Sequence, residues 1–343
     1  LRREVSGHAD RRSTTRAVRR YATIATSLTA LCTSASLGAQ PARAPFEVPA
    51  WAFPTAPAPS PAPKPDSVVR HRVPNSTRSY TMRQVGNGFD IPDWFPASHP
   101  PMPSSVQYGV APSARACGYC HLPDGQGRPE NGTLAGLPAD YIIRQVAAFK
   151  NGTRLSANPV LSTNSMHTLA KWVADSDVVS SARYFETLAL TRRNRVVEVT
   201  RVPKTRIEVM LYAYGDTGTE PIDGRLIEVP ETFARHELRD PGVPYITYVP
   251  VGSIGRGRRL AIRGPAGPAT SCMACHGADL LGKDAVPPIA GRAPSNILRQ
   301  LINFRTGARH DSASATMVPV VEKLTVSDMV ALAAYVGSRA PKR

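Results

Sequence analysis

The sequence predicts a mainly α-helical protein in which two tandem copies of one helical domain are separated by a small β-rich insert. Three observations support this. The pattern Cys-x-x-Cys-His occurs twice, at Cys117–His121 and again at Cys272–His276. The residues that follow each pattern repeat at matching intervals. The stretch between the copies, residues 192–269 and here called the insert, alternates valine and isoleucine with charged residues, as strands do.

Each pentapeptide has the spacing of a covalent haem attachment site. Two thiols three positions apart on a helix can both reach the vinyl groups of one porphyrin, and the histidine that follows can bind the iron. A redox dithiol or half of a zinc site would also use paired cysteines. Neither explains why both copies keep the histidine and begin the same downstream pattern. The sequence therefore predicts two covalently attached c-type haems, held by Cys117, Cys120 and His121 and by Cys272, Cys275 and His276.

The repeat that follows the pentapeptides stays in register over a long stretch. Counted from the first cysteine of each copy, a glycine lies at 19, a glutamine at 28, a phenylalanine at 32, a glycine at 35 and an arginine at 37. The copies slip by four residues before Met166 and Met317. Beyond these methionines an aspartate 11 residues on and a tyrosine 18 residues on match again. Such a ladder indicates an internal duplication with units of about 75 to 85 residues.

Met166 and Met317 are the predicted distal iron ligands, because they occupy the same place in the two copies. A thioether ligand raises the reduction potential and suits electron transfer more than ligand chemistry. One alternative is a methionine that only packs in the core. The other alternative is ligation by a neighbouring side chain, for which the candidates are His99, Met102, His167 and His310.

Helical spacing of apolar residues places the main elements of the copies. In the first copy it predicts a helix from near Asp140 to Gly152, a loop containing Met166, and a helix from near Asp177. In the second copy, Thr325 and Asp328 form a capping-box pattern at the start of the last helix.

A backbone carbonyl is expected to accept the proton of the proximal imidazole and so orient it. Pro288 marks the place for this carbonyl in the second copy. The first copy has Thr133 there, which leaves a difference between the two sites open.

The insert is predicted to contain strands and a basic turn. The turn is assigned to residues 252–259, which are rich in glycine and arginine. The strands are predicted at Arg195–Val202, Thr205–Ala213, Ile227–Val229 and Tyr245–Val251.

The front of the chain is typical of an exported protein. Arginines crowd the first twenty positions, and an apolar run and small residues follow, as in a secretory signal peptide, so a periplasmic location is expected. An uncleaved signal that tethers the protein is the alternative, and no other span is apolar enough to cross a bilayer. The predicted parts are a signal peptide (1–39), a proline-rich linker and wrapping segment (40–110), the first domain (111–191), the insert (192–269) and the second domain (270–343).

The formal net charge is +16, and lysine and arginine remain in excess outside the predicted signal peptide. In an exported haem protein, this excess of basic residues indicates redox proteins with acidic docking surfaces and salt-sensitive association, rather than nucleic acid. No pattern indicates an oligomeric state.

The repeated motifs resemble the class I cytochrome c domain of the cytochrome c4 family. The resemblance rests on Gly136–Ile142, Phe149–Arg154 and Met166 in the first copy, and on Phe304–Arg309 and Met317 in the second. It implies two helical haem crevices, His/Met ligation and periplasmic electron transfer. The proline-rich front and the long insert depart from that family, which joins its two domains by a short linker.

The function expected from these features is that of a dihaem carrier of single electrons, which needs no catalytic residue. Its donor would be a dehydrogenase or a membrane complex. A dihaem peroxidase is the enzymatic alternative and requires an open distal site. A sulfur-compound dehydrogenase with a thiolate ligand requires a spare cysteine, and none remains once Cys32 leaves with the signal peptide. The third possibility is a haem-bearing subunit that docks on an enzyme through the insert or the proline-rich arm.

Overall fold

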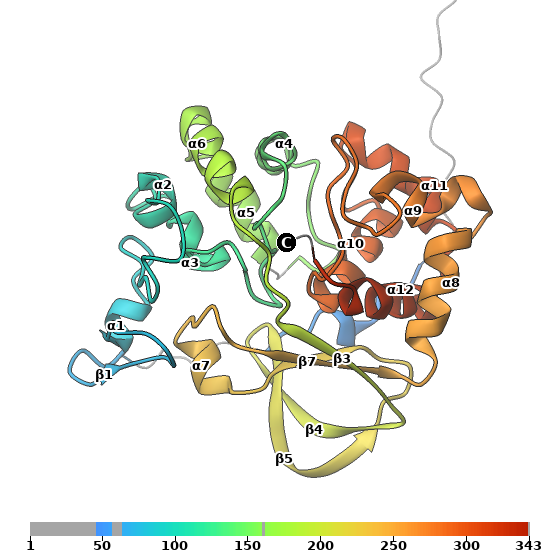
Figure 1. Cartoon of the computed structure of the whole chain (residues 1–343), viewed down its shortest axis with the longest axis horizontal. Coiled ribbons are helices and arrows are strands. Elements are labelled where there is room, and N and C mark those ends of the chain that lie inside the picture. The colour runs from blue at the N-terminus through green and yellow to red at the C-terminus, as the bar shows by residue number, and fades with distance from the viewer. Residues whose placement is uncertain (1–45, 57–63, 160–161, 342–343) are drawn as a thin grey trace, which may run out of the picture. The chain divides into compact units, whose positions relative to one another are not determined.

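The computed structural model describes residues 46–56, 64–159 and 162–341. The predicted signal peptide lies outside the described residues, as does the middle of the proline-rich tract. Figure 1 shows helical regions formed by the first copy, in green, and by the second copy, in orange and red, with strands formed by the chain between them. None of the described helices is long and apolar enough to span a membrane.

The first copy consists of a short helix that carries the pentapeptide and three longer helices around one core. Helix α4 packs against both α5 and α6, and Ile142 and Phe185 are buried in their shared core. The predicted starts near Asp140 and Asp177 are confirmed within two residues. The helices are α3 (Cys117–His121), α4 (Ala139–Lys150), α5 (Ser162–Ala170) and α6 (Asp175–Glu186).

The second copy repeats this plan and adds a long helix before its pentapeptide. Its last helix, α12, is buried along most of its length and packs on α8 and α10. The predicted capping box at the start of α12 is confirmed by the bonds between Thr325 and Asp328. The elements are α8 (Ser253–Arg263), η2 (Pro268–Thr270), α9 (Cys272–His276), α10 (Pro294–Thr306), η3 (Ser312–Met317), α11 (Val318–Val321) and α12 (Val326–Ser338).

The predicted basic turn at residues 252–259 is wrong, because this tract belongs to helix α8. Glycine lowers helix propensity, so Gly255 and Gly257 indicated a turn. In the structure Gly257 instead allows close packing, since a Cβ atom at this position would lie 2.0 Å from the carbonyl oxygen of Ala331 on α12. Tertiary contact overrides the local preference here.

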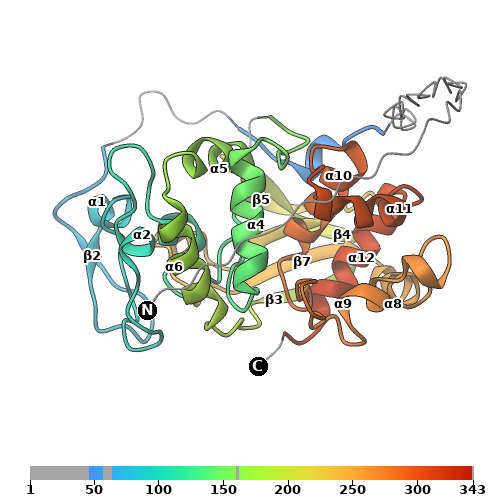
Figure 2. The ribbon, with the colours of Figure 1, turned by 90° about the horizontal axis from the view of Figure 1, so that it is seen from above.

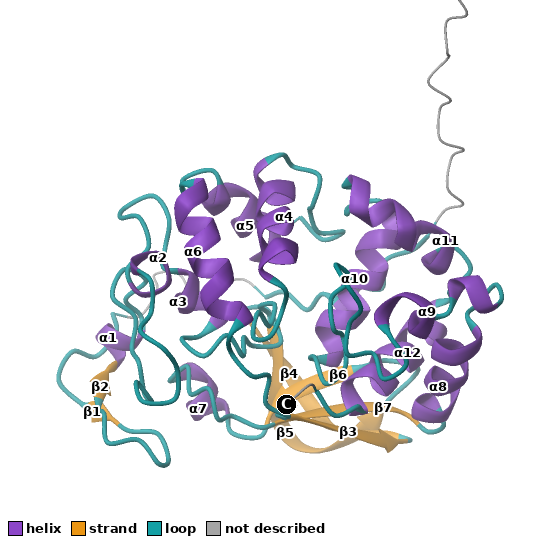
Figure 3. Ribbon diagram, turned by 45° about the horizontal axis from the view of Figure 1, so that its top comes forward, coloured by secondary structure: helices purple, strands orange, loops and turns teal. Residues whose placement is uncertain are grey.

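The insert forms two small β structures, seen in orange in Figure 3. One is a three-stranded sheet of order β3–β7–β6, in which β3 runs parallel to β7, and Figures 1 and 2 both show this pair side by side. The other is the antiparallel hairpin β4–β5. A short helix, α7, leads into β7. Their bounds are β3 (Asn194–Val199), β4 (Arg201–Glu208), β5 (Leu211–Pro221), β6 (Ile227–Pro230), α7 (Phe233–Glu237) and β7 (Tyr245–Pro250).

The prediction of one continuous strand over Thr205–Ala213 is wrong, because the chain reverses between β4 and β5. Val209 has a φ of 55° at this reversal, which is an uncommon conformation for a β-branched residue and gives no turn signal in the sequence.

The segment before the first copy wraps against the insert. Trp94 is 2% exposed, and its indole nitrogen donates to the carbonyl oxygen of Leu238, 2.9 Å away. Trp94 therefore anchors this segment against the insert. The short elements here are η1 (Ala50–Ala52), β1 (Arg70–His71), β2 (Tyr80–Thr81), α1 (Met82–Val85) and α2 (Ser104–Gln107).

Candidate functional site

The two pentapeptides form matching five-residue helices, α3 and α9. Of their cysteines, Cys275 is exposed and the other three are half-buried. Burial raises the pKa of the Cys117 and Cys272 thiols to about 11 each. The first thiol of each pair therefore faces apolar surroundings, as expected for the wall of a porphyrin crevice.

The histidines of both pentapeptides are oriented by the same backbone bond. Nδ1 of His121 lies 2.6 Å from the carbonyl oxygen of Gly132, and Nδ1 of His276 lies 2.8 Å from that of Pro287. Burial lowers the pKa of both imidazoles, which favours their neutral form. Because Nδ1 donates its proton to the carbonyl, Nε2 is left as the atom that can bind iron.

The orienting carbonyl was expected close to Pro288, and the structure places it one residue earlier. Gly132 and Pro287 each lie 11 residues after their histidine. The possible difference between the copies at this point is thus absent, because both histidines donate to an equivalent carbonyl.

The four cysteines do not converge on a shared metal. Within the ranges that the structure describes, no group of three or more histidine, cysteine, aspartate or glutamate side chains could hold a metal ion. The tetrathiolate zinc site considered from the sequence is therefore not formed.

The predicted distal ligands lie on different kinds of element. Met166 was expected in a loop, but it lies within helix α5 and is half-buried. Met317 is the last residue of η3 and packs against the core of the second copy. Their assignment as iron ligands stays a prediction.

The alternative iron ligands differ in the hydrogen bonds and packing contacts that they already make. Both ring nitrogens of His99 have partners, since Nε2 lies 3.3 Å from Asp93 and Nδ1 lies 2.9 Å from the carbonyl oxygen of Pro100. His167 and His310 each use Nδ1 to donate to a backbone carbonyl. Met102 packs against the core of the first copy.

A pair of buried arginines joins the two copies. Arg154 and Arg309 form an antiparallel bridge through their backbones. Nη1 of Arg154 and Nη2 of Arg309 both donate to Oε1 of Gln145, each over 2.8 Å. Gln300 accepts from both arginines in the same way, over 3.4 and 3.0 Å. The contact thus has an approximate twofold symmetry that matches the duplication.

These four residues are the glutamines and arginines that recur at equivalent positions in the two copies. The sequence assigned no role to them. The signal that could have revealed one was the recurrence of an arginine beside an otherwise apolar helix in both copies. The fold brings these four side chains together across the contact, and the repeated sequence pattern does not predict that packing.

The electrostatics of this pair fit a haem. Burial, together with the neighbouring Arg309, lowers the pKa of Arg154 to about 9. Nε of each arginine has no hydrogen-bond partner among the described atoms. The carboxylate of Asp311 lies 3.9 Å from Nε of Arg309, beyond hydrogen-bond distance, and further anions would balance these two cations. A haem carries two propionate carboxylates, so the residues present suit the group that the pentapeptides would bind.

Comparison with known proteins agrees with this chemistry. The family model described as Cytochrome c matches residues 261–340. Cytochrome c4 of Azotobacter vinelandii is 25% identical over 230 residues, which are 65% of this chain and 84% of that protein. A protein named thiosulfate dehydrogenase electron acceptor, from Stutzerimonas stutzeri strain A1501, is 25% identical over 236 residues, which are 67% of this chain and 82% of that protein.

Among solved structures, reduced recombinant cytochrome c4 from Pseudomonas stutzeri is similar. It is 21% identical with a TM-score of 0.42, and the match covers 65% of this chain and 93% of that one. The family model identifies a cytochrome c domain at residues 261–340, and the sequence relationships show homology to the dihaem class I cytochromes c4, with covalently attached c-type haem as the cofactor.

Proposed function

We propose that the chain carries single electrons through two haems, between a dehydrogenase or membrane complex in the periplasm and a downstream acceptor. The observation that carries this proposal is the repeated histidine geometry, in which His121 and His276 each donate Nδ1–H to an equivalent backbone carbonyl. In both copies the histidine ring is already oriented by the same backbone bond. Fixed ligands of this kind suit one-electron transfer, because electron transfer requires little movement of protein atoms.

The residues of each site have distinct roles in this proposal. The cysteines of each pentapeptide attach one porphyrin, and the histidine supplies the proximal ligand. Met166 and Met317 supply the distal thioethers, which exclude water from the iron. The bound haem supplies the one-electron couple, so no acid or base is required from the chain.

The domain division is adjusted in one place. Helix α8 packs along α12, and the cytochrome c family match begins within α8. We therefore begin the second haem domain at Ser253 rather than at residue 270, and the insert proper ends at β7.

The partner is proposed from charge and from the relatives. The excess of lysine and arginine outside the predicted signal peptide favours a partner with an acidic docking face. One relative is named as the electron acceptor of thiosulfate dehydrogenase, so a dehydrogenase of that kind is a candidate donor for this chain. Export to the periplasm rests on the signal-peptide pattern of the first 39 residues.

Optical spectroscopy of the purified protein tests the proposal. The pyridine haemochrome assay should give two covalent haems per chain. The oxidised protein should show a weak far-red charge-transfer band, the usual sign of iron–methionine ligation, and the reduced protein should not bind carbon monoxide. Met166→Ala and Met317→Ala should each remove part of the band, while Met102→Ala should leave it intact. Rapid binding of carbon monoxide by the wild-type protein would favour a peroxidase instead.

A further inference from the structure

The two orienting carbonyls lie in equivalent loops with different surroundings. Ligand loop 1, residues 126–133, contains Gly132, and ligand loop 2, residues 281–288, contains Pro287. Most of loop 1 is buried, whereas the centre of loop 2 is exposed from Lys283 to Ala285. The carbonyl that orients the histidine thus lies in a mostly buried loop in the first copy and in a partly exposed loop in the second.

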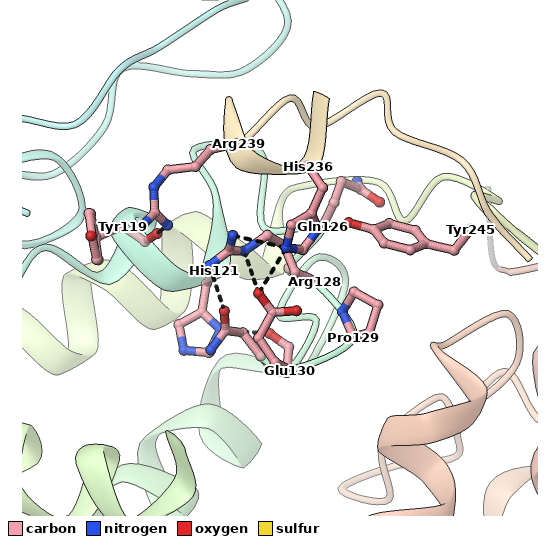
Figure 4. A network of polar contacts seen from close by, with 12 residues as sticks. Tyr119, His121, Gln126, Arg128, Pro129, Glu130, His236, Arg239 and Tyr245 are labelled. Atoms are coloured by element: carbon pink, nitrogen blue, oxygen red, sulfur yellow. Dashed lines mark hydrogen bonds and ion pairs between the residues drawn. The ribbon is translucent and has the colours of Figure 1, made fainter. Parts of the chain in front are cut away.

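Loop 1 contains a buried carboxylate that the insert holds in place. Oε1 of Glu130 lies 3.1 Å from Nε of Arg128 and 3.3 Å from Nε2 of His236 in α7. His236 is 1% exposed, and its Nδ1 lies 3.0 Å from the hydroxyl of Tyr245 on β7. Figure 4 shows Arg128 and His236 converging on Glu130 beside His121. Although burial opposes ionisation, Arg128 and His236 hold the pKa of Glu130 well below its usual range.

The insert also grips the haem attachment helix of the first copy. The guanidinium carbon of Arg239, just after α7, lies 3.7 Å from the ring centroid of Tyr119, and the same side chain donates to the backbone oxygen of Tyr119. Its Nε donates to the carbonyl oxygen of Val85, 3.1 Å away. Tyr119 lies inside the pentapeptide, where the second copy has Ala274, which offers no ring to stack on.

Further arginines hold the backbone of loop 1 from outside the first copy. Arg193 donates to the carbonyl oxygens of Gln126 and Gly127, over 2.8 and 2.7 Å. Arg292 donates to that of Thr133 over 3.0 Å. From outside its own copy, loop 2 receives only a longer bond among those described, from Arg144 to Ala285 over 3.4 Å, while Arg292 of the same copy donates to the carbonyl oxygen of Pro288 over 2.7 Å.

We propose that Glu130 is a positioning residue for His121, and that the insert acts as a clamp which fixes ligand loop 1 and makes the two haems unequal in reduction potential. This rests on the proposed function. A fixed carbonyl keeps a strong bond to Nδ1–H, which raises the basicity of the imidazole and stabilises oxidised iron. The buried negative charge of Glu130 acts in the same direction. The second copy has Ala285 in the place of Glu130, so it lacks this device.

Glu130→Gln tests the clamp, because glutamine keeps the shape and removes the charge. Spectroelectrochemical titration of the wild type should resolve two potentials. In the variant one potential should rise, the other should stay at its wild-type value, and the haem methyl resonances of one oxidised haem should shift. Tyr245→Phe should give a smaller rise in the same potential, because it removes only the hydroxyl beside His236.

Lys283→Gln is the matched control, since Lys283 occupies in loop 2 the place of Arg128. It should leave both potentials unchanged. The clamp is refuted if Glu130→Gln and Tyr245→Phe, each retaining two haems and the wild-type circular dichroism, leave both potentials unchanged or shift both equally. A wild-type protein without covalent haem would instead refute the proposed function, so the two failures are distinguishable.

Discussion

Arg154 and Arg309 occupy equivalent positions in the two copies and face each other across the contact between them, each donating to the glutamine of the other copy as well as to its own. Neither guanidinium has a hydrogen bond to a carboxylate among the described residues. Arg154 and Arg309 therefore form the contact between the copies, and under the proposed function they are also suited to the acidic groups of the haems.

Replacement of Arg309 should weaken the protein measurably. Arg309→Met removes bonds to Gln145, Gln300 and the hydroxyl of Tyr141. We expect a loss of about 1 to 3 kcal/mol in the free energy of unfolding of the haem-loaded protein, measured by denaturant titration. Lys323→Met, at an exposed position, should change it by less than about 0.5 kcal/mol. Equal effects of the two variants would contradict a role for the arginine pair.

The two glycines of α8 should respond in opposite ways to alanine. Gly257→Ala places a Cβ against the carbonyl oxygen of Ala331 and should separate α8 from α12, at a cost of about 1 to 3 kcal/mol. Gly255→Ala meets only the flexible end of Arg259, 3.7 Å away, and should stabilise the helix by up to about 1 kcal/mol. Thermal unfolding of both variants measures this difference, and a neutral Gly257→Ala would exclude close packing of the two helices.

The cap of α12 should make stability depend on acid. Burial opposes ionisation of Asp328, but bonds from Thr325 and Arg256 outweigh it and lower the pKa of this carboxyl below its ordinary value of 3.8. The stabilisation is therefore complete above that ordinary value and is lost as the pH falls through the lower folded pKa. Asp328→Asn should cost about 1 kcal/mol at pH 7, with a smaller cost in strong acid.

Asp177→Asn supplies the comparison for this cap, because Asp177 is the equivalent residue of the first copy and α6 has no side-chain cap bond. Its effect should be small at every pH. Denaturant titrations of both variants at several pH values measure these changes in the free energy of unfolding. If Asp328→Asn lowers this free energy by the same amount at every pH, the charge of Asp328 does not stabilise the helix.

The exposed arginines of α8 should steer charged reactants toward the second haem. Arg258 and Arg259 are exposed, and α8 packs against α9, whose Cys275 is also exposed. The double variant Arg258→Glu and Arg259→Glu should slow electron exchange with the anion hexacyanoferrate roughly several-fold at low salt and speed it with a cationic cobalt complex. Arg70→Glu, on β1, is the control, and stopped-flow mixing gives the rates. Changes of the same sign with both reagents would rule out steering.

The duplication made the pentapeptide positions and the main helices predictable, because its signal is local and repeated. The pentapeptides, the starts of α4 and α6 and the cap of α12 all follow from residues within a few turns of one another. Helix α8 was missed because Gly257 serves a partner helix more than 70 residues away in sequence. Local propensity contains no information about such a contact.

The clamp on the first site was unpredictable for the same physical reason. Glu130 and His236 are separated by more than 100 residues, and neither belongs to a recognisable motif. The sequence suggested that the insert could be an independent docking module. In the structure its helix α7 and strand β7 supply partners for the first copy, so that part of the insert is interior to the molecule.

This arrangement changes what the duplication means for the first copy. A chain cut after residue 191 would keep both cysteines and His121, but it would lack Arg193, His236, Arg239, Arg292 and Arg299, whose side chains secure the haem loop and helix. The first copy is therefore not structurally independent of the rest of the chain. The two copies are similar in sequence, but segments later in the chain supply contacts that the first copy needs to complete its site.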